Sequence, residues 1–516
     1  MTLDSDAGTS TRGGIDRQPA YLRLYEQIRS SILSGQLPAG SRLPASRTLA
    51  TEVGVSRNTV LAAFEQLQAE GYLVGKQGAG TFVADALPDV VVGAHHRKQS
   101  RSLDSPESLT KPAPALSRRG AGLAGNPRVR LTTTLSQRGH GAAFQVGLPA
   151  IDQFPLKSWN RMRAAHVRNL GCTLMGYNDP AGYPPLRQAI AGYIATARGI
   201  NCTPEQVVIV SGSQQALDFC SRLLTDPGDP VWLEEPGYLG ARAALESAGA
   251  RIVPVPVDNS GMQVSAGIAK EPGARLAIVT PSHQFPLNST MTLERRGALI
   301  EWAGANSSWI LEDDYDNEFW YYDRPVASLQ SIDPFGCVIY LGTFSKVLYP
   351  SLRLAYLIVP PNLVDAFVAA HLAADVHTHI TEQAIVANFI TTGHLARHVR
   401  RMRMIYSNRQ EFLLENGSKI LGDHLAFERT SGGLHVVARP HDETFDDVAA
   451  ADRAMRRGVH LWPLSQHYVD TSCGRPGLLF GFAGANESQM LAALTRVRSA
   501  LEAGGTAREG SAARVG

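Results

Sequence analysis

The sequence predicts an α/β domain that is preceded by a small α+β domain of the winged helix-turn-helix type. From Val207 onward, short apolar runs alternate with amphipathic stretches, which is typical of a mainly parallel sheet covered by helices. Before residue 85, three helical patterns are followed by two short β-like runs around a glycine-rich turn. A chain of 516 residues is long enough for both domains.

The composition indicates a globular protein with a sizeable core, because 44% of the residues are hydrophobic and 19% are charged. The five cysteines are scattered and form no Cys-x-x-Cys pair, so we expect no metal site and no disulfides. A reduced, cytoplasmic protein fits this pattern. The polar N-terminus lacks an apolar signal core, and no apolar run is long enough to predict a membrane-spanning helix.

We place the first domain at residues 17–84. Its first helix carries apolar residues at helical spacing, from Tyr21 to Ile32, and is expected to end near Ser34. Ser46 and Ser56 are predicted to cap the second and third helices. Two short strands, 72–74 and 81–83, then form a hairpin with a glycine-rich tip. Helix, helix, turn, helix and hairpin together make a winged helix-turn-helix.

Cations at two helix starts indicate that this domain binds double-stranded DNA. Arg47 and Arg57 lie just inside helix N-termini, where a cation opposes the helix dipole and a phosphate is favoured. In a major groove, Arg57 would read guanine and Asn58 adenine. The alternatives are a protein-binding winged domain or solvated arginines. The predicted contacts with a DNA operator are Arg42, Ser46, Arg47, Ser56, Arg57, Asn58, Thr59, Lys76 and Gly80.

Residues 85–138 are predicted to form a flexible linker, because prolines, serines and glycines interrupt every apolar period. The segment holds nine Lys and Arg residues against four Asp and Glu residues. It is either a plain spacer or a tether that adds non-specific phosphate contacts. At the other end of the chain, residues 506–516 are predicted to be a disordered tail.

The second domain is expected at residues 139–505. Its strand-like runs are 207–210, 231–233, 251–257, 276–280, 309–311, 338–341 and 355–359. Ligands of such sheets bind where the strands end, and polar clusters follow several of these runs. One is a Ser-Gly loop at 211–213 that opens a helix and suits a phosphate. Another is an acidic strand end that carries Asp313 and Tyr315, two residues apart and therefore on one face.

The stretch LGTFSKVLYPSLRL at 341–354 places Lys346 after a buried strand, with hydroxyls beside it and Arg353 seven residues later. A lysine of this kind can form a Schiff base with the aldehyde of pyridoxal 5'-phosphate (PLP), while hydroxyl and guanidinium groups bind the phosphate. The alternative is a surface lysine that follows a strand. The other polar clusters favour the cofactor interpretation.

Two families resemble the two halves of the chain. RLPASRTLA at 42–50, VSRNTV at 55–60, GYL at 71–73 and GAGTFV at 78–83 are similar to the GntR family of bacterial regulators. The order phosphate loop, stacking aromatic, acid, lysine, arginine resembles fold type I aminotransferases. The roles that this second resemblance implies are the Schiff base for Lys346, the ring-nitrogen contact for Asp313, the ring-hydroxyl contact for Tyr315 and ring stacking for Tyr238. It also implies phosphate contacts for Ser213, Gln214, Ser345 and Arg353, and a reach into a neighbouring subunit's cofactor for Tyr177, hence a homodimer.

The fusion of these two domains resembles the MocR subfamily of transcriptional regulators, as do the strings EDDYD at 312–316 and TPSHQFP at 280–286. The resemblance implies a cytoplasmic regulator that senses PLP, or an amine or amino-acid ligand, through an aldimine on Lys346. Genes of PLP synthesis are one possible target. Two departures speak against ordinary transamination. Leu479 stands where the enzymes usually carry the arginine for a substrate carboxylate, and Phe285 stands where they carry an asparagine. A working aminotransferase with an appended DNA-binding domain is the alternative.

Overall fold

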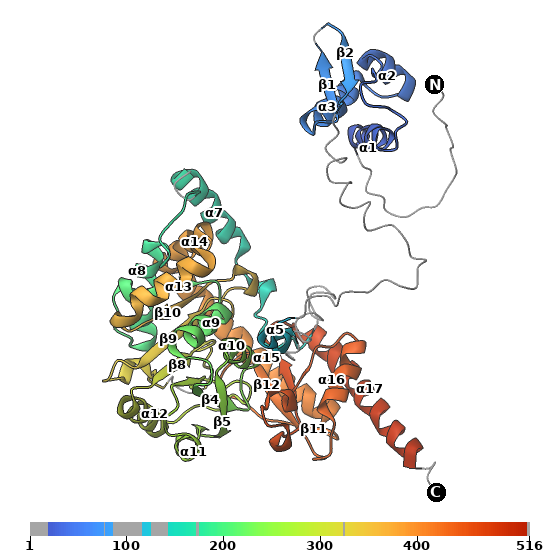
Figure 1. Ribbon diagram of the computed structural model, residues 1–516. Helices are drawn as coiled ribbons and strands as arrows, with labels where there is room; N and C mark the ends of the chain where they lie inside the picture. Colours follow the sequence, from blue (N-terminus) through green and yellow to red (C-terminus); the bar gives the residue numbers. More distant parts are fainter. Residues whose placement is uncertain are drawn as a thin grey trace, which may run out of the picture. The chain divides into compact units, whose positions relative to one another are not determined.

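The computed structural model describes residues 19–76, 78–85, 116–124, 143–171, 175–322 and 326–512. The chain divides into two compact units, Met1–Pro114 and Ala115–Gly516, and Figure 1 shows the elements of each. Residues 17 and 18 of the predicted first domain, most of the predicted linker and residues 513–516 of the predicted tail lie outside the described residues.

The first unit is a winged helix-turn-helix, as predicted. Its helices are α1 (Ala20–Leu33), α2 (Ser46–Val53) and α3 (Arg57–Ala69), and its antiparallel hairpin joins β1 (Leu73–Lys76) to β2 (Gly80–Val83). Apolar side chains at helical spacing, such as Leu24, Ile28 and Leu67, form one buried cluster with the hairpin. The Ser56 hydroxyl accepts a hydrogen bond from the Thr59 backbone N–H at 3.1 Å and caps α3. Ser46 is not a cap, because α2 already begins at this residue.

The second unit is built on an eight-stranded sheet in the order β3-β10-β9-β8-β7-β4-β5-β6. Strands β5, β4, β7, β8 and β9 run parallel, whereas β10 is antiparallel to both of its neighbours. The predicted α/β class and the seven predicted strands are confirmed. The strands are β3 (Val207–Val210), β4 (Pro230–Glu235), β5 (Arg251–Asp258), β6 (Gly261–Met262), β7 (Leu276–Val279), β8 (Trp309–Asp313), β9 (Val338–Thr343) and β10 (Ala355–Ile358).

Helices cover both faces of this sheet, which explains why its strands are apolar on both sides. Alternate strand residues such as Val208 and Leu357 pack with α9 (Ser213–Leu224), α10 (Leu239–Ala248) and α13 (Val364–Asp375). The intervening residues, such as Ile209 and Ile310, face α8 (Pro184–Arg198), α11 (Val264–Lys270), α12 (Leu293–Asn306) and α14 (Ile380–Thr391). Helix α7 (Leu156–Leu170) contacts α14.

A second, antiparallel sheet in the order β11-β12-β14-β13 was not predicted from the sequence. Its strands are β11 (Leu425–Phe427), β12 (His435–Pro440), β13 (Trp462–Pro463) and β14 (Leu478–Gly481). Figure 1 shows these C-terminal strands near the helices α16 (Asp447–Arg456) and α17 (Glu487–Ala512), and the long helix α15 (His394–Leu421) packs on β11 and α17. This sheet matters because its β12 and β13 supply residues to the cavity described below.

Two segments differ from the expectation of irregular structure. Within the predicted linker, residues Arg118–Ala124 form the short helix α5, which contacts α10. Helix α17 continues to Ala512, past residue 506, where a disordered tail was expected.

None of the helices that the structure describes is long and apolar enough to cross a membrane. Among the same residues, no group of three or more His, Cys, Asp or Glu side chains could hold a metal ion.

Candidate cofactor site and nucleic-acid interface

The predicted DNA-contacting residues lie on α2, α3 and the hairpin of the first unit, except for Arg42, which precedes α2, and Ser56, which caps α3. Arg42, Arg47, Arg57 and Asn58 are exposed, whereas Ser46 and Thr59 are half-buried. The Arg57 Nε donates to the Ser46 hydroxyl at 3.4 Å, so the starts of α2 and α3 lie close together. Exposed cations at adjoining helix starts form a surface that suits the phosphates of DNA.

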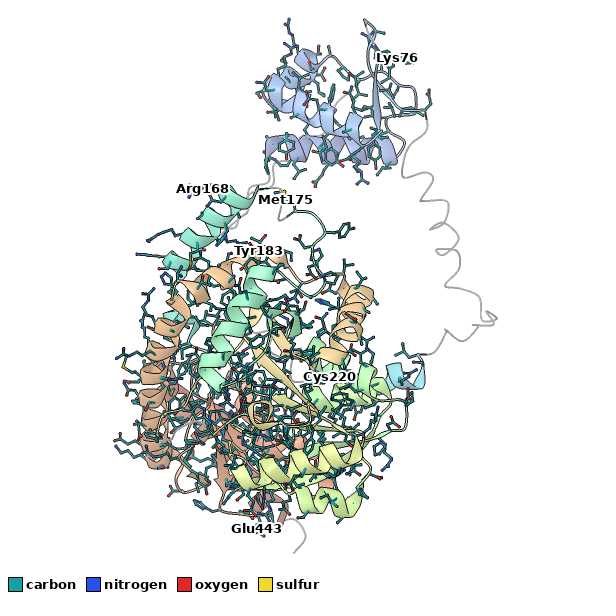
Figure 2. The ribbon with its side chains drawn as sticks, turned by 90° about the vertical axis from the view of Figure 1, so that its left-hand side faces the viewer. Lys76, Arg168, Met175, Tyr183, Cys220 and Glu443 are labelled. Carbon is teal, nitrogen blue, oxygen red and sulfur yellow. The ribbon has the colours of Figure 1, made fainter. Side chains whose placement is uncertain are left out.

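The hairpin adds a second group of predicted contacts. The Lys76 ammonium lies 5.0 Å from the centre of the Phe82 ring, and Figure 2 labels Lys76 on the hairpin of this unit. Gly80 has a φ of 110°, and a Cβ at this position would lie 3.1 Å from the Arg42 Nε. Glycine therefore permits both the backbone conformation and the close approach of Arg42.

A cavity of about 270 Å³ opens in the second unit where β8 and β9 end. It brings together Ser213, Tyr238, Asp313, Tyr315 and Lys346, which come from four separate stretches of the sequence. Reasoning from the sequence missed several other lining residues, notably Thr280, His435 and Trp462. The complete lining is Gln145, Val146, Gly147, Leu148, Ser213, Tyr238, Thr280, Phe285, Asp313, Tyr315, Lys346, Pro350, Leu434, His435 and Trp462.

Lys346 reaches across this cavity from the turn after β9. Its Nζ donates a hydrogen bond to the backbone oxygen of Gly147 at 3.0 Å, although 199 residues separate the two in sequence. Gly147 has a φ of 73°, and a Cβ there would lie 2.3 Å from the Lys346 Nζ. Any larger residue at position 147 would push the amine out of its present place.

Two polar atoms on the cavity wall lack partners. The Asp313 Oδ1 and the Tyr315 hydroxyl are buried and have no hydrogen-bond partner among the residues that the structure describes. Such orphans are rare in folded proteins, because each costs about 1–3 kcal/mol. Burial, reinforced by Asp314, raises the pKa of Asp313 to about 8, and burial raises that of Tyr315 well above its usual range. Both groups are suited to a ligand that supplies a donor to one and an acceptor to the other.

The opposite end of the site is built for an anion. Helix α9 begins at Ser213, and a helix start offers N–H donors. The Arg353 Nη2 donates to the Ser211 backbone oxygen at 2.8 Å, and a Cβ on Gly212 would lie 2.9 Å from that nitrogen. Gln214 donates to the Gly240 oxygen at 2.9 Å and so ties α9 to α10. Gln214, Ser345 and Arg353 are close in sequence to the lining residues Ser213, Lys346 and Pro350, but they do not line the cavity themselves.

These residues fit PLP. A pyridine nitrogen would meet Asp313, a ring oxygen would meet Tyr315, a phosphate would meet the α9 start, and an aldehyde would meet Lys346. Glu234 helps to position the lining residue Thr280. Its Oε2 accepts hydrogen bonds from the Thr280 hydroxyl at 2.6 Å and from the Gln284 amide at 3.1 Å.

Tyr177 does not reach the cavity of its own chain. Its side chain is 92% exposed, and it lines a separate hollow with Met175, His377 and His379. Figure 2 places Met175 and Arg168 at the edge of this unit and Cys220 inside it.

Asp313 gives a pH-dependent prediction for the cofactor-free protein. Because its folded pKa of about 8 exceeds its unfolded value of 3.8, the stability that its proton contributes is lost between those two values as pH rises. Stability should therefore fall from pH 6 to pH 8 by up to about 1.4 kcal/mol per pH unit from this group. Asp313→Asn should make the profile less steep, as measured by urea unfolding of both proteins, while weakening retention of PLP; the raised pKa values of Glu234, Glu312 and Glu318 account for the slope that remains. An unchanged profile would contradict this role.

Comparisons with known proteins agree with both halves of the structure. The sequence profile of class I and II aminotransferases matches residues 149–497, and that of the GntR family of bacterial regulatory proteins matches residues 20–83. The probable rhizopine catabolism regulatory protein MocR of Rhizobium meliloti is 39% identical over 97% of this chain and 95% of its own length. The pyridoxine biosynthesis transcriptional regulator PdxR of Corynebacterium glutamicum is 29% identical over 93% and 96%.

Solved structures match the second unit. An archaeal alanine:glyoxylate aminotransferase has a TM-score of 0.68 and 25% identity, and the match covers 74% of this chain and 97% of that one. LysN, an alpha-aminoadipate aminotransferase from Thermus thermophilus complexed with N-(5'-phosphopyridoxyl)-L-leucine, has a TM-score of 0.67 and 28% identity, and that match covers 75% and 99%. The aminotransferase fold of the second unit is therefore established.

Proposed function

The chain belongs to the MocR subfamily of GntR-type transcriptional regulators, and from this premise we propose that it binds PLP on Lys346 and couples the state of that pocket to DNA binding. Its first unit is a DNA-binding domain of the GntR type. Its second unit has the fold of enzymes that depend on PLP. The proposal concerns the residues that hold the cofactor and the signal that reaches the DNA.

The observation that carries the proposal is the meeting of Lys346 with two orphaned polar atoms in one cavity. Asp313 and Tyr315 have buried atoms that lack partners among the described residues, and both line the cavity with Lys346. A structural cluster has no need for such orphans, and they cost stability. A ligand that pairs with both would recover that loss.

Each residue has a defined task in this proposal. Asp313 would keep the ring nitrogen protonated, because a pyridinium beside it would offset the burial that now raises the pKa of this carboxyl. Tyr315 would hydrogen-bond the ring oxygen, and Tyr238 would stack on the ring. Ser213 would bind the phosphate at the start of α9, and Gln214, Ser345 and Arg353 would bind it or shape its site. When bound, the cofactor supplies an aldehyde carbon that reacts reversibly with primary amines.

We further propose that the active form is a homodimer. Tyr177 is 92% exposed and Met175 is 83% exposed, and the nearby helix α7 exposes Leu156 and Val167. Exposed large apolar side chains on neighbouring segments favour a partner surface. Two winged domains on one dimer could then bind two half-sites of an operator.

The second candidate function is transamination. The fold of the second unit favours it, but Leu479 and Phe285 provide no charged or amide contact for a substrate carboxylate. Turnover of an amino donor with a keto acid would establish this alternative. We expect none beyond a slow half-reaction.

The target genes are not fixed by the family. One relative is named for rhizopine catabolism and another for pyridoxine biosynthesis, so PLP-synthesis genes are one candidate among several.

DNA binding tests the output half of the proposal. Arg57→Ala should weaken binding to a selected operator by about 1–3 kcal/mol, which is roughly 5- to 150-fold, because one base or phosphate contact is removed. The matched control is Arg23→Ala, an exposed arginine on α1, which should leave the affinity unchanged. Titrations of wild-type protein with and without PLP should give different operator affinities. Equal affinities in both titrations would refute the coupling.

A further inference from the structure

One wall of the cofactor cavity is apolar where aminotransferases bind a carboxylate. Val146, Phe285 and Trp462 line the cavity and belong to a single buried cluster with Leu479 and Val437. Leu479 is fully buried on β14 and pairs in register with Val437 on β12 and with Trp462 on β13. Side chains paired across neighbouring strands in this way point to the same face of the sheet. The wall is therefore continuous hydrocarbon and aromatic surface.

Positive charge is scarce around this wall. Among the lining residues that the structure describes, Lys346 is the one lysine or arginine. Burial lowers the pKa of His435, and burial lowers that of His467 to about 4, so both imidazoles are neutral.

Two arginines of the small sheet and its loop, Arg439 and Arg475, are the candidates for binding a carboxylate, but they line another cavity. That cavity shares no lining residue with the cofactor cavity. Tyr468 and Leu287 line it from the same apolar cluster as Leu479, so this cluster separates the two cavities.

An ionised carboxylate on this wall would lose its water without gaining a partner. Burying such a charge is among the costliest changes in protein binding. A hydrogen atom or hydrocarbon group at the same place would gain from contact with Val146, Phe285 and Trp462, behind which Leu479 is packed. The wall therefore distinguishes two classes of amine by the group next to the nitrogen.

We propose that the pocket takes primary amines whose amino-bearing carbon carries no carboxylate, in preference to α-amino acids. This inference rests on the proposed function, because the amine would react at the cofactor that Lys346 holds. The ligand nitrogen would form a bond to the cofactor carbon as the bond from Nζ of Lys346 breaks. The two N–H protons of the ligand would pass to Nζ, so the exchange needs no oxidant or reductant.

Matched pairs of ligands test the inference on PLP-loaded, full-length protein. The pairs are phenethylamine with phenylalanine, histamine with histidine, and isoamylamine with leucine. Each is titrated while the visible absorption is recorded, and each binding constant is repeated by calorimetry. The amine of each pair should bind at least about 100-fold more tightly than its amino acid, as expected when a buried charge lacks its partner.

Variants locate the selectivity on the wall. Leu479→Arg should reverse the preference within each pair, because it supplies a guanidinium partner for the carboxylate. Phe285→Asn should shift the preference in the same direction. It provides the test of the wall if circular dichroism shows that Leu479→Arg is unfolded. Leu491→Arg, at a position on α17 that is 45% exposed, adds the same charge elsewhere and should leave the preference unchanged.

The outcomes separate the two levels of the proposal. A protein with the absorption of lysine-bound PLP that binds both members of each pair equally, or neither member, overturns the inference alone. A protein that never acquires this absorption overturns the proposed function, and the inference with it. Unaltered selectivity in both wall variants, when they are folded, would also overturn the inference.

Discussion

Lys346→Ala is expected to abolish the visible absorption that PLP gives to the wild-type protein. Borohydride should fix the cofactor on the wild-type chain, and peptide mapping should find it at residue 346. The alanine variant should retain none after dialysis. The reason is positional, since the Lys346 Nζ is the one lysine amine on the cavity wall among the described residues. Loss of the covalent bond should weaken retention by at least about 100-fold, or roughly 3 kcal/mol.

The matched control is Lys270→Ala, which removes a lysine from the same unit but away from this cavity. Its Nζ donates to the Pro254 backbone oxygen at 2.7 Å, and the residue is exposed. This variant should keep both the absorption and the borohydride-fixed adduct. If Lys346→Ala kept them as well, another nucleophile would hold the cofactor and the assignment of Lys346 would be wrong.

The Lys346→Ala variant also separates cofactor binding from DNA binding. The winged domain is a compact unit with its own buried core, so Lys346→Ala should still bind operator DNA. It should, however, respond identically with and without PLP. Loss of all DNA binding would instead indicate that the pocket is needed for assembly of the regulator.

The main sheet could be predicted from the sequence because each of its strands carries a local pattern. Val207–Val210 was predicted with its observed limits, and all four of its residues are buried. Strands that are covered on both faces are apolar throughout, so each appears in the sequence as a run of consecutive apolar residues. The same holds for α3, whose start is marked by Ser56 and whose buried stripe includes Val60 and Leu67.

The second sheet and most of the cavity lining could not be predicted, because their determinants are contacts between distant residues. β13 has two residues, and its role depends on pairing with Leu478 and Leu479. Gly147 precedes Lys346 by 199 residues, and no local signal connects them. Trp462 enters the cavity from β13, which is too short to show a period, and His435 enters it from the first residue of β12. A glycine in an otherwise apolar stretch was the one available hint, because close approach often requires it.

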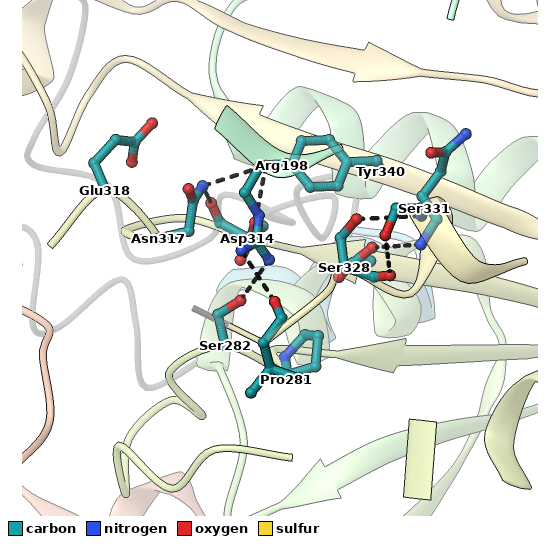
Figure 3. Close-up of polar contacts among 12 residues, drawn as sticks. Arg198, Pro281, Ser282, Asp314, Asn317, Glu318, Ser328, Ser331 and Tyr340 are labelled. Carbon is teal, nitrogen blue, oxygen red and sulfur yellow. Dashed lines mark hydrogen bonds and ion pairs between the residues drawn. The ribbon is translucent and has the colours of Figure 1, made fainter. Parts of the chain in front are cut away.

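The strand-end loop that carries Asp313 and Tyr315 is held by a buried ion pair, and breaking it should have the largest effect on stability. Arg198, the last residue of α8, places its Nε 2.8 Å from the Asp314 Oδ2, and the two side chains are 2% and 0% exposed. Figure 3 shows Arg198 among Asp314, Ser282 and Tyr340. The Arg198 Nη2 donates to the Ser282 hydroxyl at 3.0 Å, and the Tyr340 hydroxyl donates to Asp314 at 2.8 Å. Burial opposes the charge on Arg198, but Asp314 raises its pKa above the ordinary value.

Arg198→Met should destabilise the second unit by about 3–5 kcal/mol, because it leaves the Asp314 carboxylate buried without its counter-charge. Arg198→Met combined with Asp314→Asn should recover most of this loss, since both charges are then absent. Arg498→Met is the control. It breaks an exposed pair with Glu502 on α17, with side chains 49% and 52% exposed, and should cost less than about 1 kcal/mol.

Urea unfolding, followed by the fluorescence of the tryptophans in the second unit, measures all three variants. Retention of PLP should fall in the same order as stability, because Asp314 lies between Asp313 and Tyr315 in the chain. If Arg198→Met cost no more than Arg498→Met, water would be reaching Asp314. The placement of Asp313 and Tyr315 would then have to depend on other contacts of the loop, such as the His283 Nδ1, which lies 2.8 Å from the Asp316 Oδ1.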